Sequence, residues 1–204
     1  MFILYAIPVG ILVGFLLGGR LAGLAAIQFK WAWLIMLGLA IQLVLFSDYV
    51  TERIGWVGVP IYVLSTLAVA GAVAANFRIR GMPIVLAGAV SNLAAILANG
   101  GYMPTSVAAL ESLGHEFTGA YSNSSFDPNP ALPWLTDIFA MPAWMPQANV
   151  FSIGDVLIDL GMVVVIAAAM RTGARKPSVQ AVDARRGGQN DPAPDPTAPD
   201  SAAA

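Results

Sequence analysis

Cysteine is absent from this chain of 204 residues. Its absence excludes disulfide bonds, thiolate catalysis and every metal site that needs a cysteine ligand. Histidine occurs once, as His115, so a zinc site built on a pair of histidines is not expected. We therefore expect no bound metal and no cofactor.

Charged residues are also scarce. They make up 11% of the chain, hydrophobic residues make up 57%, and the mean hydropathy is +0.72. Soluble domains carry about 25% charged residues, because a surface in contact with water needs them. The composition therefore predicts an all-α integral membrane protein. Its expected partner is the lipid bilayer, and no nucleic-acid partner is expected.

Five apolar runs are long enough, or nearly so, to cross a bilayer, which takes roughly 20 residues. They cover residues 2–19, 31–46, 56–75, 82–98 and 153–170. These runs predict a five-span polytopic membrane helix bundle over residues 1–172. The second run is short, so we expect its helix to begin among residues 25–29. The tail over 173–204 is rich in Pro, Ala, Asp and Gly, which predicts disorder.

The long segment 99–151 is expected to be more than a connector. Structureless loops beyond about 12–15 residues are usually functional or disordered, and this one is too aromatic for plain disorder. We expect it to fold back as a cap over the helix ends. Thr105 or Ser106 can cap a short helix that Gly114 would stop, and Pro133 can open a second short helix.

The basic residues predict the orientation of the bundle. Nine of the ten lie on one proposed side: Arg20, Lys30, Arg78, Arg80, Arg171, Arg175, Lys176, Arg185 and Arg186. Only Arg53 lies on the other side. Short loops rich in Lys and Arg stay in the cytoplasm. The N-terminus and segment 99–151 are therefore expected outside, and the tail is expected in the cytoplasm.

The first apolar run contains Gly10, Gly14 and Gly18 at a spacing of four residues. Such a spacing forms a groove that another helix can approach closely. We expect a helix of the same chain to fill the groove. The alternative is a contact with a second copy or with another membrane protein.

Two carboxylates lie where segment 99–151 meets the last apolar run. Ser152 and Asp155 have the spacing of a capping box, which would explain Asp155 as a structural residue. Asp159 lies one turn further along the same face, inside the expected span. An ionisable residue in a span is a functional hypothesis by default. Four residues are candidate partners for its carboxylate: Gln42, Arg53, Asn92 and Asn99.

A third acid, Asp137, can approach Asp155 or Asp159 if segment 99–151 folds back. Two close carboxylates share a proton and their pKa values move apart, an arrangement used in acid–base hydrolysis. These three acids are the candidate catalytic residues. A wider polar site is expected from Asn92, Asn99, Gly100, Gly101, Asn149, Ser152, Asp155 and Asp159.

Three stretches resemble a family of small bacterial integral membrane proteins known only as a domain of unknown function. They are Asn99-Gly-Gly-Tyr-Met-Pro104, Thr136-Asp-Ile-Phe139 and Asn149-Val-Phe-Ser-Ile-Gly-Asp-Val-Leu-Ile158. The resemblance covers residues 1–172. It implies a multi-span protein of the bacterial plasma membrane, and it implies no activity.

Three functions remain open at this point. The first is a non-enzymatic binding, sensing or assembly component, which the lack of a complete catalytic constellation favours. The second is an outer-face hydrolase that uses Asp155 with Asp137 or Asp159. The third is a small transporter or transporter subunit, which a polar path from Gln42 through Asn92 to Asp159 would favour.

Overall fold

The computed structural model of the chain describes residues 3–114, 124–125, 128–146 and 148–172. The chain divides into two units, residues 1–174 and 175–204. The expected disordered tail and His115 lie outside the described residues. The described part is mostly helical, as the composition predicted.

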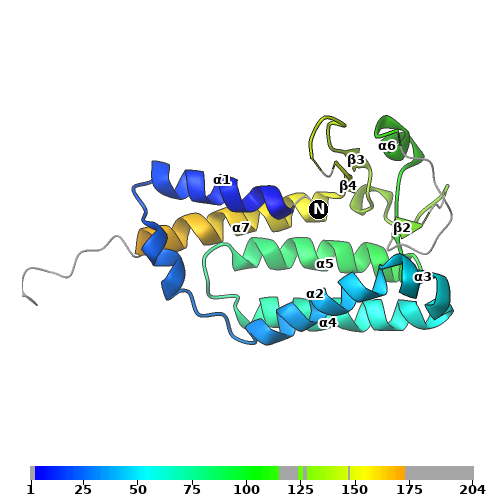
Figure 1. Cartoon of the computed structure of the whole chain (residues 1–204), viewed down its shortest axis with the longest axis horizontal. Coiled ribbons are helices and arrows are strands. Elements are labelled where there is room, and N and C mark those ends of the chain that lie inside the picture. The colour runs from blue at the N-terminus through cyan, green and yellow to red at the C-terminus, as the bar shows by residue number, and fades with distance from the viewer. Residues whose placement is uncertain (1–2, 115–123, 126–127, 147, 173–204) are drawn as a thin grey trace, which may run out of the picture. The chain divides into compact units, whose positions relative to one another are not determined.

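Each of the five apolar runs forms a helix (Figure 1). They are α1 (Ile3–Leu16), α2 (Ala32–Leu45), α4 (Gly58–Ala75), α5 (Met82–Ala98) and α7 (Ile153–Thr172). The helices pack on one another in the spatial order α1, α7, α5, α4, α2. By length and composition, Gly55–Ala75 and Ile153–Thr172 could cross a membrane, whereas α1, α2 and α5 are shorter apolar helices.

Shorter elements connect these helices. The 3₁₀ helix η1 (Leu21–Ala26) follows α1, and α3 (Asp48–Ile54) and η2 (Gly55–Val57) lead into α4. Segment 99–151 contains α6 (Val107–Ser112), η3 (Pro133–Leu135) and four two-residue strands. These strands are β1 (Met103–Pro104), β2 (Ser124–Ser125), β3 (Phe139–Ala140) and β4 (Val150–Phe151). β1 pairs with β2 in parallel, and β3 pairs with β4 in antiparallel orientation, with Phe139 opposite Phe151.

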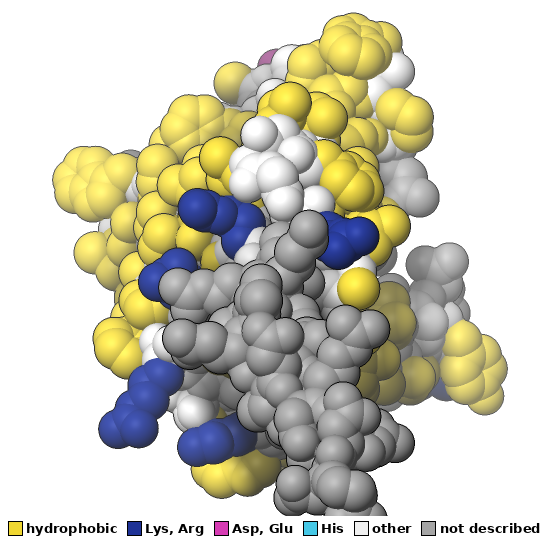
Figure 2. Space-filling model, turned by 90° about the vertical axis from the view of Figure 1, so that its left-hand side faces the viewer, with side chains coloured by type: hydrophobic (Ala, Val, Ile, Leu, Met, Phe, Trp, Pro, Cys, Tyr) yellow, Lys and Arg dark blue, Asp and Glu magenta, His cyan; other side chains and the backbone are white. Residues whose placement is uncertain are grey.

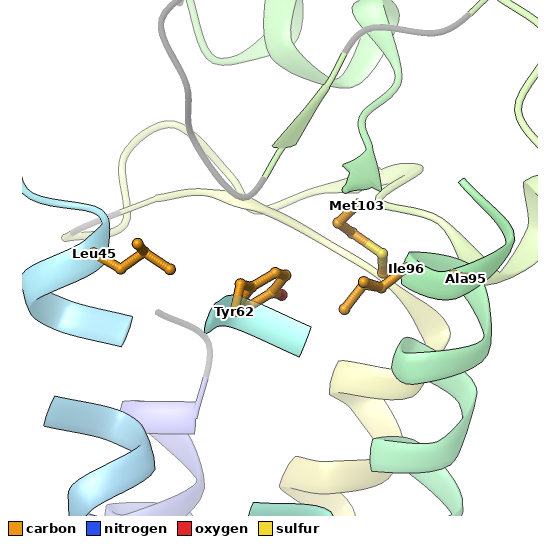
Figure 3. Packing of buried hydrophobic residues seen from close by; sticks show 5 residues of the cluster. All are labelled: Leu45, Tyr62, Ala95, Ile96 and Met103. Atoms are coloured by element: carbon orange, nitrogen blue, oxygen red, sulfur yellow. The ribbon is translucent and has the colours of Figure 1, made fainter. Parts of the chain in front are cut away.

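The bundle has two ends that differ in chemistry. We call the cap end the one where the helices meet segment 99–151, and the basic end the one that holds residues 17–31 and 76–81. At the cap end, Leu45, Tyr62, Ala95, Ile96 and Met103 form a buried apolar cluster (Figure 3). Met103 enters this cluster from segment 99–151. The segment is therefore part of the hydrophobic core and does not merely connect α5 to α7.

The groove of α1 is filled by α7. A Cβ atom on Gly10 would contact Ile166, and one on Gly14 would overlap the side chain of Met170. The helix ends just before Gly18, whose φ of +75° is favourable only for glycine. A second copy of the chain could use this groove only by displacing α7.

The helix α2 begins at Ala32, and the expected start among residues 25–29 is wrong. The side chain of Asn76 accepts a hydrogen bond from the Lys30 N–H (2.8 Å) and donates one to the Lys30 carbonyl (2.8 Å). Trp31 then adopts a left-handed conformation, with φ 56°. Because both backbone groups of Lys30 are bonded to Asn76, an α-helix cannot continue back through this residue.

Asn99 forms the same kind of clamp at the cap end. Like Asn76 on α4, it is the C-cap residue of its helix, α5. Its amide donates to the carbonyls of Ala95 (2.7 Å) and Ala131 (2.9 Å) and accepts from the Ala131 N–H (2.8 Å). Asn99 therefore caps α5 through Ala95 and fastens segment 99–151 to the end of this helix through Ala131.

Candidate functional site

The first turn of α7 carries the expected capping box. The Ser152 N–H donates to Oδ2 of Asp155 (2.9 Å), and the Asp155 N–H donates to Oγ of Ser152 (3.1 Å). Two backbone donors at the helix start are thereby satisfied by side chains. The carboxylate also lies at the positive end of the helix dipole. The prediction made from the spacing of these two residues is confirmed.

Asn92 joins this capping box to α5. Its Nδ2 donates to Oδ1 of Asp155 (2.8 Å), and its Oδ1 lies 2.8 Å from Oγ of Ser152. That hydroxyl also lies 2.9 Å from Oδ2 of Asp155, and its one proton can serve either acceptor. Ser152 is fully buried. The network therefore links α5 to the start of α7 through one buried hydroxyl and two partly buried side chains.

Two glycines allow the helices to approach closely enough for this network. A Cβ on Gly154 would overlap the amide oxygen of Asn92, and a Cβ on Gly88 would overlap the Gly154 carbonyl. Helices pack this closely only where small residues face each other. The position of Asn92 beside Asp155 therefore depends on glycine at both positions.

A cavity of ≈ 220 Å³ lies beside this network. Its polar lining consists of Gln42, Tyr62, Thr66, Asn92, Asp137 and Asp155. Apolar side chains that include Leu39, Val69, Ile96, Met103 and Ile158 complete the wall. The cavity thus draws on α2, α4, α5 and α7, and segment 99–151 supplies Met103 and Asp137. We call it the cap-end cavity.

Asp137 is held in the wall of this cavity by its backbone. Its N–H donates to the Pro104 carbonyl (3.0 Å), and its carbonyl accepts from the Ser106 N–H (3.0 Å). The residue is 8% exposed. Within the described part of the chain, no hydrogen bond reaches its carboxylate. Burial, and then the negative charge of Asp155, raise the pKa of Asp137 to about 7.

The other polar groups of the cavity connect α2 to α4. Nε2 of Gln42 lies 3.2 Å from both Oγ of Ser65 and Oγ1 of Thr66. Both hydroxyls in turn donate to the Tyr62 carbonyl, at 2.8 and 2.9 Å. Hydrogen bonds of this kind are common between packed apolar helices. Gln42 and Thr66 therefore have a structural role in addition to their place in the cavity wall.

The structure divides the polar site that the sequence predicted. It brings together Asn92, Ser152 and Asp155 and adds Asp137 to them. Asp159 does not line the cavity, and no described residue donates a hydrogen bond to its carboxylate. Seven residues along α7 from Asp159, Ile166 packs on Gly10, so Asp159 lies on the α1 side of the helix.

The remaining predicted residues hold segment 99–151 in place. Gly100 and Gly101 adopt positive φ angles of 71° and 93° in the turn after α5. Oδ1 of Asn149 accepts from the Val150 N–H (2.9 Å). The expected partners of Asp159 are also engaged elsewhere. Arg53, for example, donates to the Tyr49 carbonyl (2.7 Å) and lies over the Tyr49 ring.

The sequence did not indicate Tyr62 or Met103 as residues of the site. Tyr62, Thr66, Val69 and Ala70 line the cavity at positions i, i+4, i+7 and i+8, so they occupy one face of α4. That spacing was a usable signal for Tyr62. For Met103 there was none, because its place depends on how segment 99–151 returns to the helix ends.

Metal binding has no support from the described residues. Among them, no group of three or more His, Cys, Asp or Glu side chains could hold a metal ion. The chemistry of the cap-end cavity is therefore that of two carboxylates, two amides and two hydroxyl groups in a largely apolar wall.

These features define an α-helical bundle with a polar cavity at one end, bordered by an irregular segment that contributes Met103 to the core. The chain belongs to DUF5317, a family of unknown function, whose family model matches residues 26–167. The match runs from η1 into the last turns of α7, so it includes every residue of the cavity. No curated protein and no solved structure matches the chain. The resemblance inferred from the sequence is confirmed at the level of the family.

Proposed function

We propose that the chain is an integral membrane protein and that it binds a small cationic molecule in the cap-end cavity. In this proposal it acts as a non-enzymatic binding or sensing component of a bacterial plasma membrane. The single observation that carries the binding role is Asp137, a buried carboxylate without a hydrogen-bond partner among the described residues, in the wall of a cavity that a second carboxylate also lines.

The exposed apolar surface of the helices supports the membrane location. In the two helices of spanning length, only 33% and 39% of the apolar window is buried, whereas the core helix of a soluble protein is mostly buried. Leu12, Met36, Leu43 and Leu64 are 58%, 67%, 67% and 65% exposed. Soluble proteins rarely expose apolar surface on this scale, and a bilayer would cover it.

Five spans, with the N-terminus outside and the tail in the cytoplasm, remain part of the proposal. The helices α1 and α2 have 14 residues each and α5 has 17, so they are about 21–26 Å long against a hydrocarbon core of about 30 Å. Each packs on α4 or α7, the helices of spanning length. We propose that flanking residues complete these three crossings.

The chain contains no cysteine, so single cysteines introduced on either proposed side can be labelled to test this topology. A cysteine introduced at Glu111 in α6 should react with a membrane-impermeant maleimide added to intact cells. One introduced at Arg78, between α4 and α5, should react only after the membrane is permeabilised. Both side chains are exposed in the structure, so burial does not confound the comparison. Labelling of Arg78→Cys in intact cells would contradict the proposed orientation.

Charge complementarity supports a cationic ligand. Asp137 and Asp155 both line the cavity, and no Lys, Arg or His is among the described residues around it. A buried carboxylate without a counter-ion is costly, and a bound cation would remove that cost by pairing with it. The apolar wall would favour a cation that carries hydrocarbon, such as an alkylammonium ion, over a hydrated metal ion.

The hydrogen bonds of Asp155 favour binding over hydrolysis. An acid–base pair of carboxylates needs free oxygen atoms that can activate water. Both oxygens of Asp155 already accept hydrogen bonds from Asn92 and Ser152. The shared cavity of Asp137 and Asp155 is the observation that keeps a hydrolase as the second candidate. A transporter has less support. The polar path expected for it runs from Gln42 through Asn92 to Asp159. In the structure the polar groups of the cavity end at Asp155, whereas Asp159 lies outside the cavity.

A matched pair of probes tests the binding role. Tert-butylammonium and tert-butanol have nearly the same shape but differ in charge. We expect tert-butylammonium to raise the Tm of the detergent-purified protein at pH 8, and tert-butanol to leave it unchanged. The cationic shift should be lost in Asp137→Asn. Equal shifts with the two probes, or an undiminished shift in the variant, would contradict a charge-specific site.

A further inference from the structure

The basic end of the bundle gathers most of the described positive charge. Arg20, Lys30, Arg78, Arg80 and Arg171 are all exposed there, and no described acid lies at that end. Figure 2 shows these Lys and Arg side chains spread over one end of the molecule, with hydrophobic side chains around them. The positive-inside rule accounts for their side of the membrane but not for the cavity that lies among them.

This second cavity has a volume of ≈ 450 Å³, and we call it the basic-end cavity. Its walls come from residues 26–28, from Ile79 and Arg80, and from the last turns of α7. Three of its lining residues are polar, namely Gln28, Arg80 and Thr172, and the rest are apolar. A free anion would contact Arg80 but would leave most of the wall without a partner.

Two further basic residues, Arg20 and Arg171, lie at the same end of α7 but are not among the residues that line this cavity. The Arg20 N–H donates to the Met170 carbonyl (2.9 Å), which places the backbone of Arg20 against the last turn of α7. Gly23 permits this crossing, because a Cβ there would overlap the Ala169 carbonyl. Arg78 precedes Arg80 by two residues in the short connection between α4 and α5. The cavity is therefore mostly apolar, with Arg80 in its wall and other exposed cations at the same end of the bundle.

We propose that the basic-end cavity binds one anionic phospholipid, with the phosphate at Arg80 and an acyl chain along the apolar wall. Basic pockets between helices on the cytoplasmic side are suited to anionic headgroups, and nearby Lys and Arg side chains attract them. This inference rests on the proposed membrane location, and it is independent of the cap-end cavity.

The test measures which lipids stay bound to the purified protein. Native mass spectrometry of the detergent-solubilised full chain should show one phosphatidylglycerol retained at least several-fold more often than phosphatidylcholine. Arg80→Gln should reduce this retention several-fold. The control is Arg53→Gln, which removes a cation at the other end of the bundle and should leave retention unchanged. Arg80 is exposed, so its replacement should not unfold the protein.

Three outcomes would overturn the proposal. The first is equal retention of phosphatidylglycerol and phosphatidylcholine. The second is an equal loss of lipid retention in Arg80→Gln and Arg53→Gln. The third is displacement of the lipid by inorganic phosphate alone, which would indicate a free-phosphate site. Extraction of membranes with alkaline carbonate separates this failure from failure of the membrane location. A chain released by carbonate would refute the location, whereas a retained chain with no lipid preference would refute only the lipid site.

Discussion

Replacing Asp137 by asparagine is expected to stabilise the protein at pH 8 and to do so much less at pH 5. In the folded chain the pKa of Asp137 is raised to about 7, whereas in the unfolded chain it returns to its ordinary value of 3.8. Between these two values the folded state binds more protons than the unfolded state. The free energy of unfolding therefore falls as the pH rises through this window, and it levels off above about pH 7.

The size of the effect follows from the width of the window. From pH 5 to pH 7, each pH unit costs the wild type about 1.4 kcal/mol, or about 3 kcal/mol in all. Asparagine does not ionise, so the gap in stability between variant and wild type should widen by about that amount between pH 5 and pH 8. Thermal or denaturant unfolding in one detergent over this pH range measures it. Glu111→Gln is the control, since Glu111 is an exposed acid and should show no such widening.

A stabilising result would have a functional meaning. Groups that lower stability at neutral pH are typical of functional sites, where the charge is needed although a neutral side chain would fold better. If Asp137→Asn is instead less stable than the wild type at pH 8 by the same margin as at pH 5, the carboxylate is not the strained group that the structure describes.

Exchanging the carboxylate and the amide between positions 92 and 155 is the second large prediction. Asn92→Asp alone brings two carboxylates together in the partly buried network. Asp155→Asn alone turns an amide N–H toward the hydrogen-bond donors of Asn92 or Ser152. Each single variant should lower the free energy of unfolding by about 2–4 kcal/mol, since buried donors or charges lose their partners.

The double variant should recover most of that loss. With Asp at 92 and Asn at 155, the side-chain amide at position 155 can donate to the carboxylate at position 92. The side-chain carbonyl at position 155 can still accept from the Ser152 N–H. The coupling between the two sites should therefore be favourable and at least about 2 kcal/mol, measured as a double-mutant cycle in unfolding experiments. Additive losses would show that Asn92 and Asp155 do not interact as the structure indicates.

Local features of the fold could be predicted from the sequence. All five apolar runs are helices, and the capping box of Ser152 and Asp155 follows from a spacing of three residues. The short helix α6 begins after Ser106 and ends before Gly114, as predicted, but neither Ser106 nor Thr105 makes the expected side-chain capping hydrogen bond. These features depend on neighbours within one or two turns, so composition and spacing determine them.

Contacts between distant segments could not be predicted in the same way. The start of α2 at Ala32 depends on a clamp from Asn76, which lies 46 residues away. The pairing of Gly88 with Gly154 decides which helix faces α7, and neither glycine is distinctive in an apolar run. For the same reason the sequence could not choose between Asp137 and Asp159 as the second acid of the site.

The pKa of Asp137, with and without a bound cation, tests the central claim most directly. Infrared difference spectra of the wild type against Asp137→Asn report the protonation of this one carboxyl group as the pH is varied. The structure places its pKa at about 7 in the free protein. Saturating tert-butylammonium should lower that pKa by pairing with the carboxylate, and tert-butanol should not change it. A pKa that stays the same with the cation bound would contradict a cation site at Asp137.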